Sequence, residues 1–161
     1  MADHQIDKSK KNYSILNLGN EITLKDFLYA LIPMVETFSL VIRDYPFNKK
    51  QEEFLLKLSL YEVSRVLTKE WPGTRLLGKN SAYLFNYKFC QSSIDILNCF
   101  VKDLFELYEQ NLPEDICLYR EDSTPLFISI SHEKDAFISV DEEEFKFIEW
   151  KIPRLKVESY L

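Results

Sequence analysis

The side chains with the clearest capacity for acid–base or metal chemistry are His132, Glu133 and Asp135, in the segment HEKDA. A zinc-protease helix places a second histidine four residues after the first, whereas HEKDA has alanine there and follows a strand pattern. We therefore interpret His132 as a turn residue that contacts Glu133 or Asp135. A small hydrolase or metal-dependent enzyme centred on these three side chains is the alternative function.

Other catalytic patterns are missing from the sequence, which has no GxSxG elbow, glycine-rich phosphate loop or dinucleotide fingerprint. A nucleophilic pair of Cys117 and His132 is formally available, but Cys117 lies in an apolar strand pattern and is expected in the core. The cysteines Cys90, Cys99 and Cys117 fit neither a disulfide framework nor a CxxC metal knuckle. We expect Cys99 and Cys117 to be buried thiols, and we assign no catalytic residue, metal or cofactor.

The carboxylates are concentrated in one part of the chain. Residues 113–150 carry 11 acidic and 3 basic side chains, a net charge of −8, whereas residues 1–112 carry 14 of each. One interpretation is solvated hairpin loops, together with acidic residues from Asp141 to Glu144 that cap a helix and face its dipole. The other is an acidic patch that attracts a basic protein surface.

The second interpretation predicts a binding site, provided that the turns joining the last three strands lie side by side. Tyr119 is included as an aromatic anchor of the kind that dominates many interfaces. The predicted partner-binding residues are Glu114, Asp115, Tyr119, Glu121, Asp122, His132, Glu133 and Asp135.

The composition bounds the class of protein. With 161 residues, of which 46% are hydrophobic, the chain fits one domain with a sizeable core. A net charge of −6 disfavours nucleic acids and anionic membranes as partners, since both attract basic proteins. No stretch resembles a signal peptide or a membrane span, so we expect a soluble, cytoplasmic protein. Residues 1–12 are expected to be a disordered tail, and residues 13–161 a single α+β domain.

The elements that position these side chains follow from capping residues and periodicity. Residues 13–18 predict a short edge strand, and Thr23 with Asp26 predicts the start of a helix. After Pro33, residues 37–43 fit either a kinked helix or a strand. The strand is favoured, because proline disrupts a helix and the segment is rich in β-branched side chains.

The next segment predicts a long helix. Asn48 with Gln51 forms a start signal, and apolar residues recur at helical spacing to about residue 69. The sequence WPGT at 71–74 ends the helix in a turn. The predicted buried stripe consists of Leu56, Leu60, Val63 and Leu67.

Residues 81–89 alternate in the way that is typical of a strand, with an aromatic face expected to pack under a helix. A helix is then predicted from Ser92 or Ser93 to about Gln110. Three short strands follow with brief connections, which favours an antiparallel meander. A last helix begins at Asp141. The fold class is therefore α+β: an antiparallel or mixed sheet that ends in a three-strand meander, with helices mainly on one face.

Three motifs carry a family resemblance. WPGT at 71–74, LPEDICLYR at 112–120 and SISHEKDAF at 129–137, followed by DEEE, resemble a family of small uncharacterised bacterial proteins over roughly residues 36–148. The resemblance implies a bacterial origin and the order strand, helix, strand, helix, meander. Because no activity is associated with that family, it transfers no catalytic residue.

The leading hypothesis is a non-catalytic bacterial binding protein of the immunity or antitoxin kind, which occludes a basic toxin domain through an acidic hairpin edge. The enzyme centred on His132 is one alternative. A structural homo-oligomer joined through an exposed sheet edge is another.

Overall fold

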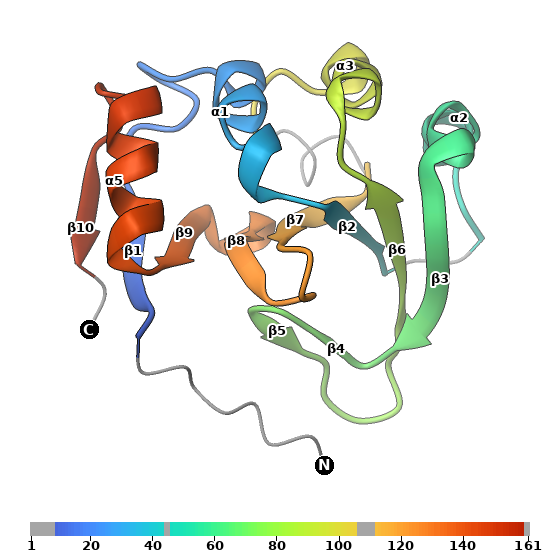
Figure 1. Cartoon of the computed structure of the whole chain (residues 1–161). Coiled ribbons are helices and arrows are strands. Elements are labelled where there is room, and N and C mark those ends of the chain that lie inside the picture. The colour runs from blue at the N-terminus through green and yellow to red at the C-terminus, as the bar shows by residue number, and fades with distance from the viewer. Residues whose placement is uncertain (1–8, 44–45, 106–111, 160–161) are drawn as a thin grey trace.

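The computed structural model describes residues 9–43, 46–105 and 112–159. They form an eight-stranded sheet in the order β10-β1-β9-β8-β7-β2-β6-β3 (Figure 1). Each pair of neighbouring strands is antiparallel. The strands are β1 (Lys11–Ile15), β2 (Thr37–Ile42), β3 (Glu62–Thr68), β6 (Ala82–Lys88), β7 (Glu114–Tyr119), β8 (Pro125–Ile130), β9 (Asp135–Val140) and β10 (Val157–Ser159).

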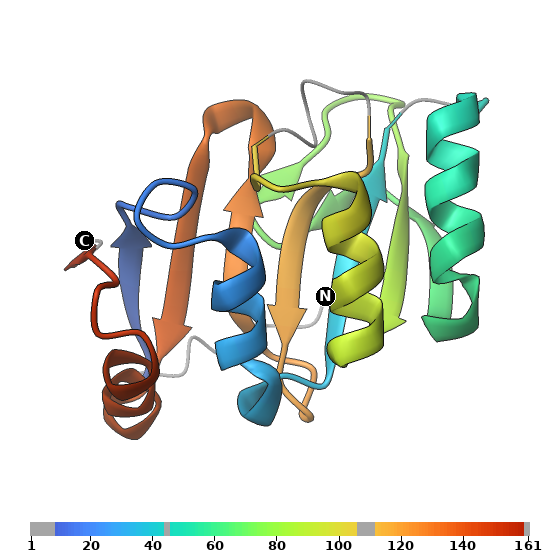
Figure 2. The same ribbon diagram turned by 90° about the horizontal axis from the view of Figure 1, so that it is seen from above.

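Helices cover one face of this sheet, and a small hairpin lies on the other (Figures 1 and 2). The expected α+β class, with a sheet ending in the meander β7-β8-β9, is confirmed. Within the described residues, no helix is long and apolar enough to cross a membrane. The helices are α1 (Leu24–Ala30), η1 (Ile32–Met34), α2 (Lys49–Leu58), η2 (Ser59–Tyr61), α3 (Gln91–Phe100), η3 (Ser131–Glu133) and α5 (Glu142–Lys151), and the hairpin strands are β4 (Glu70–Trp71) and β5 (Thr74–Arg75).

The main core lies between the sheet and the helices. Phe27 of α1 packs against Phe127 of β8, and Phe38 of β2 packs against Tyr87 of β6, all fully buried. Of the aromatic side chains predicted to pack under a helix, Phe85, Tyr87 and Phe89 lie in the same buried cluster as Phe54 of α2 and Ile94 of α3. Burial of such large apolar side chains is the dominant stabilising contribution to a domain of this size.

A second, smaller cluster fixes the β4–β5 hairpin on the opposite face. It is formed by Val41, Trp71 and Ala82. Gly73 at the tip has a φ of +89°, and a Cβ there would lie 3.1 Å from side-chain atoms of Ile128 and Ile130. The WPGT turn therefore needs glycine both for its backbone conformation and for space beside β8.

Several local predictions are confirmed. The Oγ1 of Thr23 accepts a hydrogen bond from the Asp26 amide at 3.1 Å and so caps α1. Asn48 forms the expected capping box at the start of α2, and Asp141 forms one at the start of α5. Residues 37–42 are the strand β2, which lies between β7 and β6 inside the sheet.

The long helix predicted for residues 48–69 is wrong. Helix α2 ends at Leu58, a 3-10 turn follows, and the chain then forms β3. The stripe expected to be buried is exposed instead, because these side chains lie on the outer side of α2, on η2 and on a terminal strand. It consists of Leu56, Leu60, Val63 and Leu67.

Two other boundaries also differ from prediction. Lys11 and Asn12, expected in a disordered tail, belong to β1, and β1 pairs with both β9 and β10 instead of forming an edge. Cys90 is the cap residue of α3 in place of Ser92 or Ser93, and the helix ends at Phe100. Residues 1–8 of the predicted tail and residues 106–110 of the predicted helix lie outside the described residues.

Candidate functional site

The two turns of the meander lie at opposite ends of the sheet. The β7–β8 turn carries Glu121 and Asp122, and the β8–β9 turn carries Glu133. Successive antiparallel strands reverse direction, so neighbouring turns of a meander must point to opposite ends. The prediction that all of these carboxylates form one surface is therefore wrong. They divide into two sets with different surroundings.

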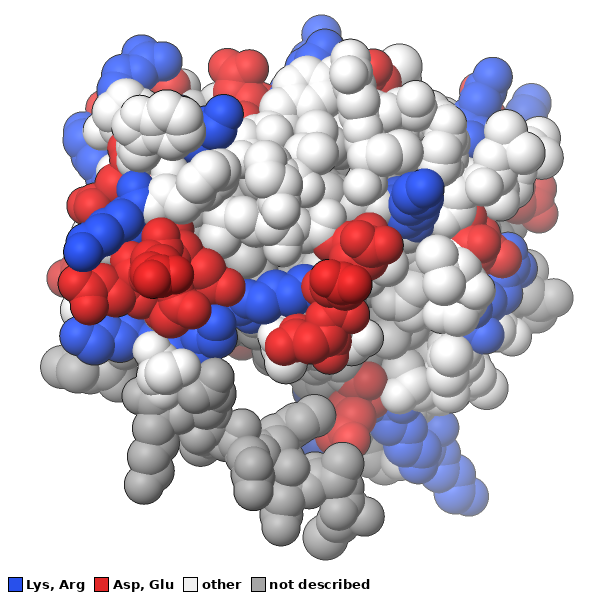
Figure 3. Space-filling view, viewed as in Figure 1, with Lys and Arg blue, Asp and Glu red and all other residues white. Residues whose placement is uncertain are grey.

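The end of the sheet that contains the β7–β8 turn is strongly acidic. The start of β2 lies beside the end of β7, since Thr37 pairs with Tyr119, and α5 begins close by. Figure 3 shows two groups of acidic side chains on this face, with basic side chains between them. We call this surface the acidic end; its carboxylates are Glu36, Glu121, Asp122, Asp141, Glu142, Glu143 and Glu144.

An open groove of about 580 Å³ lies at the acidic end. One wall is apolar and comes from residues 32–35, which are η1 and the residue after it. The other wall is polar and consists of Arg120, Glu121, Asp122 and Glu144, and Glu36 lies next to the apolar wall. A groove with these walls suits a ligand that has both an apolar part and a positive charge.

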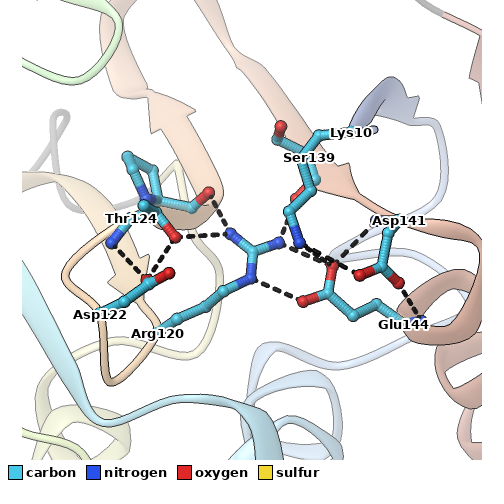
Figure 4. Close-up of polar contacts among 8 residues, drawn as sticks. Lys10, Arg120, Asp122, Thr124, Ser139, Asp141 and Glu144 are labelled. Carbon is cyan, nitrogen blue, oxygen red and sulfur yellow. Dashed lines mark hydrogen bonds and ion pairs between the residues drawn. The ribbon is translucent and has the colours of Figure 1, made fainter. Parts of the chain in front are cut away.

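Arg120 holds the polar wall together (Figure 4). Its Nε and Nη2 donate to the two carboxylate oxygens of Glu144 at 2.7 and 2.8 Å. Its other hydrogen bonds go to the carbonyls of Pro125 (2.8 Å) and Ser139 (2.5 Å) and to Oγ1 of Thr124 (3.3 Å). These contacts engage the whole guanidinium and connect the β7–β8 turn, β9 and α5. The role of Arg120 is therefore to position this wall.

The pKa values of Asp122 and Glu144, two acidic side chains beside Arg120, are lowered. Hydrogen bonds from the hydroxyl and amide of Thr124 lower the pKa of Asp122. For Glu144, burial acts in the raising direction, yet the hydrogen bonds from Arg120 and from the Asp141 amide leave its pKa lowered. Lys10 lies 3.2 Å from both Asp141 and Glu144.

Asp115 lies at the opposite end of the sheet and is 1% exposed. Its carboxylate accepts hydrogen bonds from Nε1 of Trp71 at 2.9 Å and from the Ser131 amide at 2.7 Å. Arg43 forms an ion pair with Glu114, which is also buried, and lies 3.6 Å from Asp115. Both carboxylates are used inside the molecule, so assigning Glu114 and Asp115 to a partner-binding surface was wrong.

His132 lies next to this buried cluster. Its Nδ1 is 3.4 Å from Nη2 of Arg43, and its Nε2 is 3.7 Å from the Glu133 carboxylate. The expected contact between His132 and Glu133 is therefore present, and Glu133 is exposed. Asp135 begins β9 opposite Ile130. In the part of the chain that the structure describes, no three His, Cys, Asp or Glu side chains are grouped as metal ligands.

Tyr119 does not present its hydroxyl to a partner. The hydroxyl is hydrogen-bonded to that of Ser39 on β2 at 2.9 Å, and burial raises its pKa. Cys117 is buried as expected, and burial raises the pKa of its thiol to about 12. Cys99 is exposed, contrary to expectation, because it lies on the outer side of α3.

The structure therefore retains Glu121 and Asp122 from the predicted site and adds residues that the sequence reasoning missed. The missed residues are Glu36, the apolar segment 32–35, Arg120 and Glu144. Glu144 was assigned only to helix capping, although it also binds Arg120. No local signal links residues 32–36 to residues 120–144; only the pairing of β2 with β7 brings them together.

Comparisons with known proteins identify no relative of this chain. No protein-family model matches the chain, and neither a curated protein nor a solved structure shows a significant match.

Proposed function

We propose that this chain is a non-catalytic, cytoplasmic binding protein of the immunity or antitoxin kind, which holds a basic segment of a partner protein in the groove at the acidic end. The observation that carries the proposal is the groove itself, with an apolar wall at residues 32–35 and carboxylates along the other side. A lysine or arginine side chain has the matching chemistry, because its methylene stem is apolar and its tip is cationic.

The distribution of charge supports a basic partner at the acidic end. The acidic end carries seven carboxylates against Lys10, Arg120 and Lys146. Arg120 is fully engaged by hydrogen bonds within the protein, and Lys146 lies 3.1 Å from Glu142. The potential outside the groove is therefore negative, which steers a basic surface toward it and raises the association rate at low salt. A surface of this charge is complementary to the cationic surface of a basic toxin domain.

The groove is tested with a short peptide that alternates lysine and leucine, titrated into the ¹⁵N-labelled protein and followed by NMR. We expect shifts at residues 32–36 and at the β7–β8 turn. The double variant Glu36→Lys/Glu121→Lys should weaken binding about tenfold and reduce its salt dependence. Both side chains are exposed, and the substitutions spare the hydrogen bonds of Asp122.

The matched control is Glu70→Lys/Glu133→Lys, which makes the same change in net charge at exposed positions away from the groove. It should change the affinity by less than about twofold. Equal losses in the two double variants, or shifts spread over all acidic parts of the surface, would refute the groove as the binding site.

A further inference from the structure

Strand β3 ends the sheet on one side (Figure 1). It is seven residues long and pairs with β6 on its inner side only. An edge strand presents backbone amides and carbonyls that another strand can pair with. The opposite edge is formed by β10, which has only three residues, Val157–Ser159. Thus β3 is the longer of the two unpaired edges in the described sheet.

The surface around this edge is apolar. Five aliphatic side chains from the end of α2, from η2 and from β3 are solvent-exposed, with exposed fractions from 49% for Val66 to 90% for Leu60. Val66 pairs with Leu84 and Leu67 with Tyr83, so these two exposed side chains lie on opposite faces of the edge strand, and a strand added there would have apolar side chains beside it on both faces. The five are Leu56, Leu60, Val63, Val66 and Leu67.

The usual protection of an edge strand is weak here. Proline is absent from β3, and the bulge lies near its first residues, between Glu62 and Ser64. The one cationic side chain, Arg65, is directed back over its own sheet: its guanidinium lies 4.7 Å from the Phe85 ring centroid and 2.9 Å from Glu62. The stretch from Ser64 to Thr68 therefore offers a regular, unguarded edge.

We propose that a second copy of this chain binds at this edge, with β3 antiparallel to β3 of the other copy about a two-fold axis at Val66. An isologous contact of this kind closes after two copies, whereas pairing of β3 with β10 would continue as an open chain. The dimer would extend the sheet across the axis and bring the exposed aliphatic groups of both copies together. The proposal is independent of the groove at the acidic end.

The sequence of β3 fits this register. In an antiparallel pair, two residues that lie directly opposite each other have their side chains on the same face of the sheet. A two-fold axis midway between two consecutive residues would pair side chains from opposite faces, so the axis must pass through a residue position. An axis at Arg65 would oppose two guanidinium groups. An axis at Val66 pairs Val66 with itself, Arg65 with Leu67 and Ser64 with Thr68, and so avoids facing like charges.

Charge also permits a second copy at this edge. The whole chain has a net charge of −6, which acts against association of two copies unless the contact surface itself is neutral. Strand β3 has one acidic and one basic residue, Glu62 and Arg65, which form an ion pair with each other. The edge is therefore an apolar surface with no net charge to oppose self-association.

Sedimentation equilibrium tests the oligomeric state. The full chain should sediment as a dimer of the 19.1 kDa subunit, and Val66→Lys should shift the equilibrium to monomer by at least about tenfold. Leu77→Lys is the control, because Leu77 is 83% exposed and lies outside β3; it should remain dimeric. Far-ultraviolet circular dichroism verifies that each variant is folded.

The register is tested by cross-linking and does not depend on the folding of the lysine variant. In a Cys90→Ser/Cys99→Ser background, Val66→Cys should form a disulfide-linked dimer under mild oxidation, whereas Leu77→Cys should not. A wild-type chain that is monomeric up to about 1 mM would overturn the proposal. So would equal dimerisation of the two lysine variants or equal cross-linking of the two cysteine variants.

Discussion

At the scale of single residues, Glu114 and Asp115 are buried charges at the end of the sheet opposite the groove. The binding hypothesis had wrongly placed them on a partner-binding surface. Asp115 has a φ of +55°, a conformation that aspartate tolerates better than most residues. Its carboxylate accepts hydrogen bonds from Trp71 and Ser131 and so connects the β4–β5 hairpin to the meander. A buried charge with this set of partners stabilises one arrangement of the chain.

Replacement of Asp115 tests this role. Asp115→Ala leaves the Trp71 indole N–H and the Ser131 amide without acceptors, and Arg43 with a weaker counter-charge. We expect a loss of about 3 to 5 kcal/mol in the free energy of unfolding, measured by urea denaturation. Asp115→Asn should lose less, because asparagine keeps an acceptor oxygen and tolerates positive φ. If both variants were as stable as Glu133→Ala, the exposed control, the cluster would have no structural role.

Glu114 gives a prediction for pH dependence. Burial and the neighbouring Asp115 carboxylate raise its pKa above the ordinary value of 4.5, although Arg43 opposes the shift. The folded protein therefore holds this proton more tightly than the unfolded chain, and ionisation of Glu114 removes stability as pH rises from 4.5 through the raised pKa.

The measurement is urea denaturation of the wild type and Glu114→Gln from about pH 4 to about pH 8. We expect the wild type to lose stability relative to the variant as pH rises from 4.5 through the raised pKa of Glu114, and to keep a constant difference above that pKa. A difference that stays constant, or that changes in favour of the wild type, would contradict the raised pKa.

At the scale of elements, Arg120 provides hydrogen bonds to polar groups of three different elements, as a capping residue does for the end of a single helix. Its side chain is 11% exposed and that of Glu144 is 18% exposed, so their pairing is largely shielded from solvent. Lysine has no planar fork and cannot reproduce the paired contact with Glu144 together with the carbonyl contacts.

We therefore expect Arg120→Ala to reduce the free energy of unfolding by about 2 to 4 kcal/mol, measured by urea denaturation, and Arg120→Lys to recover less than half of that loss. Glu142→Ala, two residues before Glu144 on α5 and exposed, should change stability by less than about 0.5 kcal/mol. Full recovery by lysine would show that charge alone matters and that the hydrogen-bond geometry does not.

The error at residues 48–69 also belongs to this scale. Apolar side chains recur at helical spacing across the whole segment, but Phe54, Leu55 and Leu58 are the ones that α2 buries. After the 3-10 turn, Val63, Val66 and Thr68 favour a strand through their β-branched side chains. The two patterns overlap at the transition, and pairing with β6 decides between them.

At the scale of the whole molecule, antiparallel order separates two kinds of acidic side chain. The end with the β7–β8 turn presents carboxylates to solvent around a groove, and the opposite end buries Glu114 and Asp115 against Arg43. The edge at β3 lies apart from the groove, since β2 and β6 come between β7 and β3 in the sheet. The groove would therefore stay open in the proposed dimer.

The sequence by itself determined what depends on neighbouring residues. Helix caps at Thr23, Asn48 and Asp141 and the meander of short strands follow from local hydrogen bonding and periodicity, and all are present. The burial of Cys117 was equally predictable from its apolar surroundings.

Only the tertiary structure decided which of these elements meet. It placed residues 32–36 beside residues 120–144, divided the carboxylates between two ends, and turned a predicted buried stripe into an exposed edge. The physical reason is that strand pairing joins residues far apart in the chain. The neighbour with which a strand pairs depends on how much apolar surface the whole sheet and its helices bury together. No short segment of the sequence determines that amount.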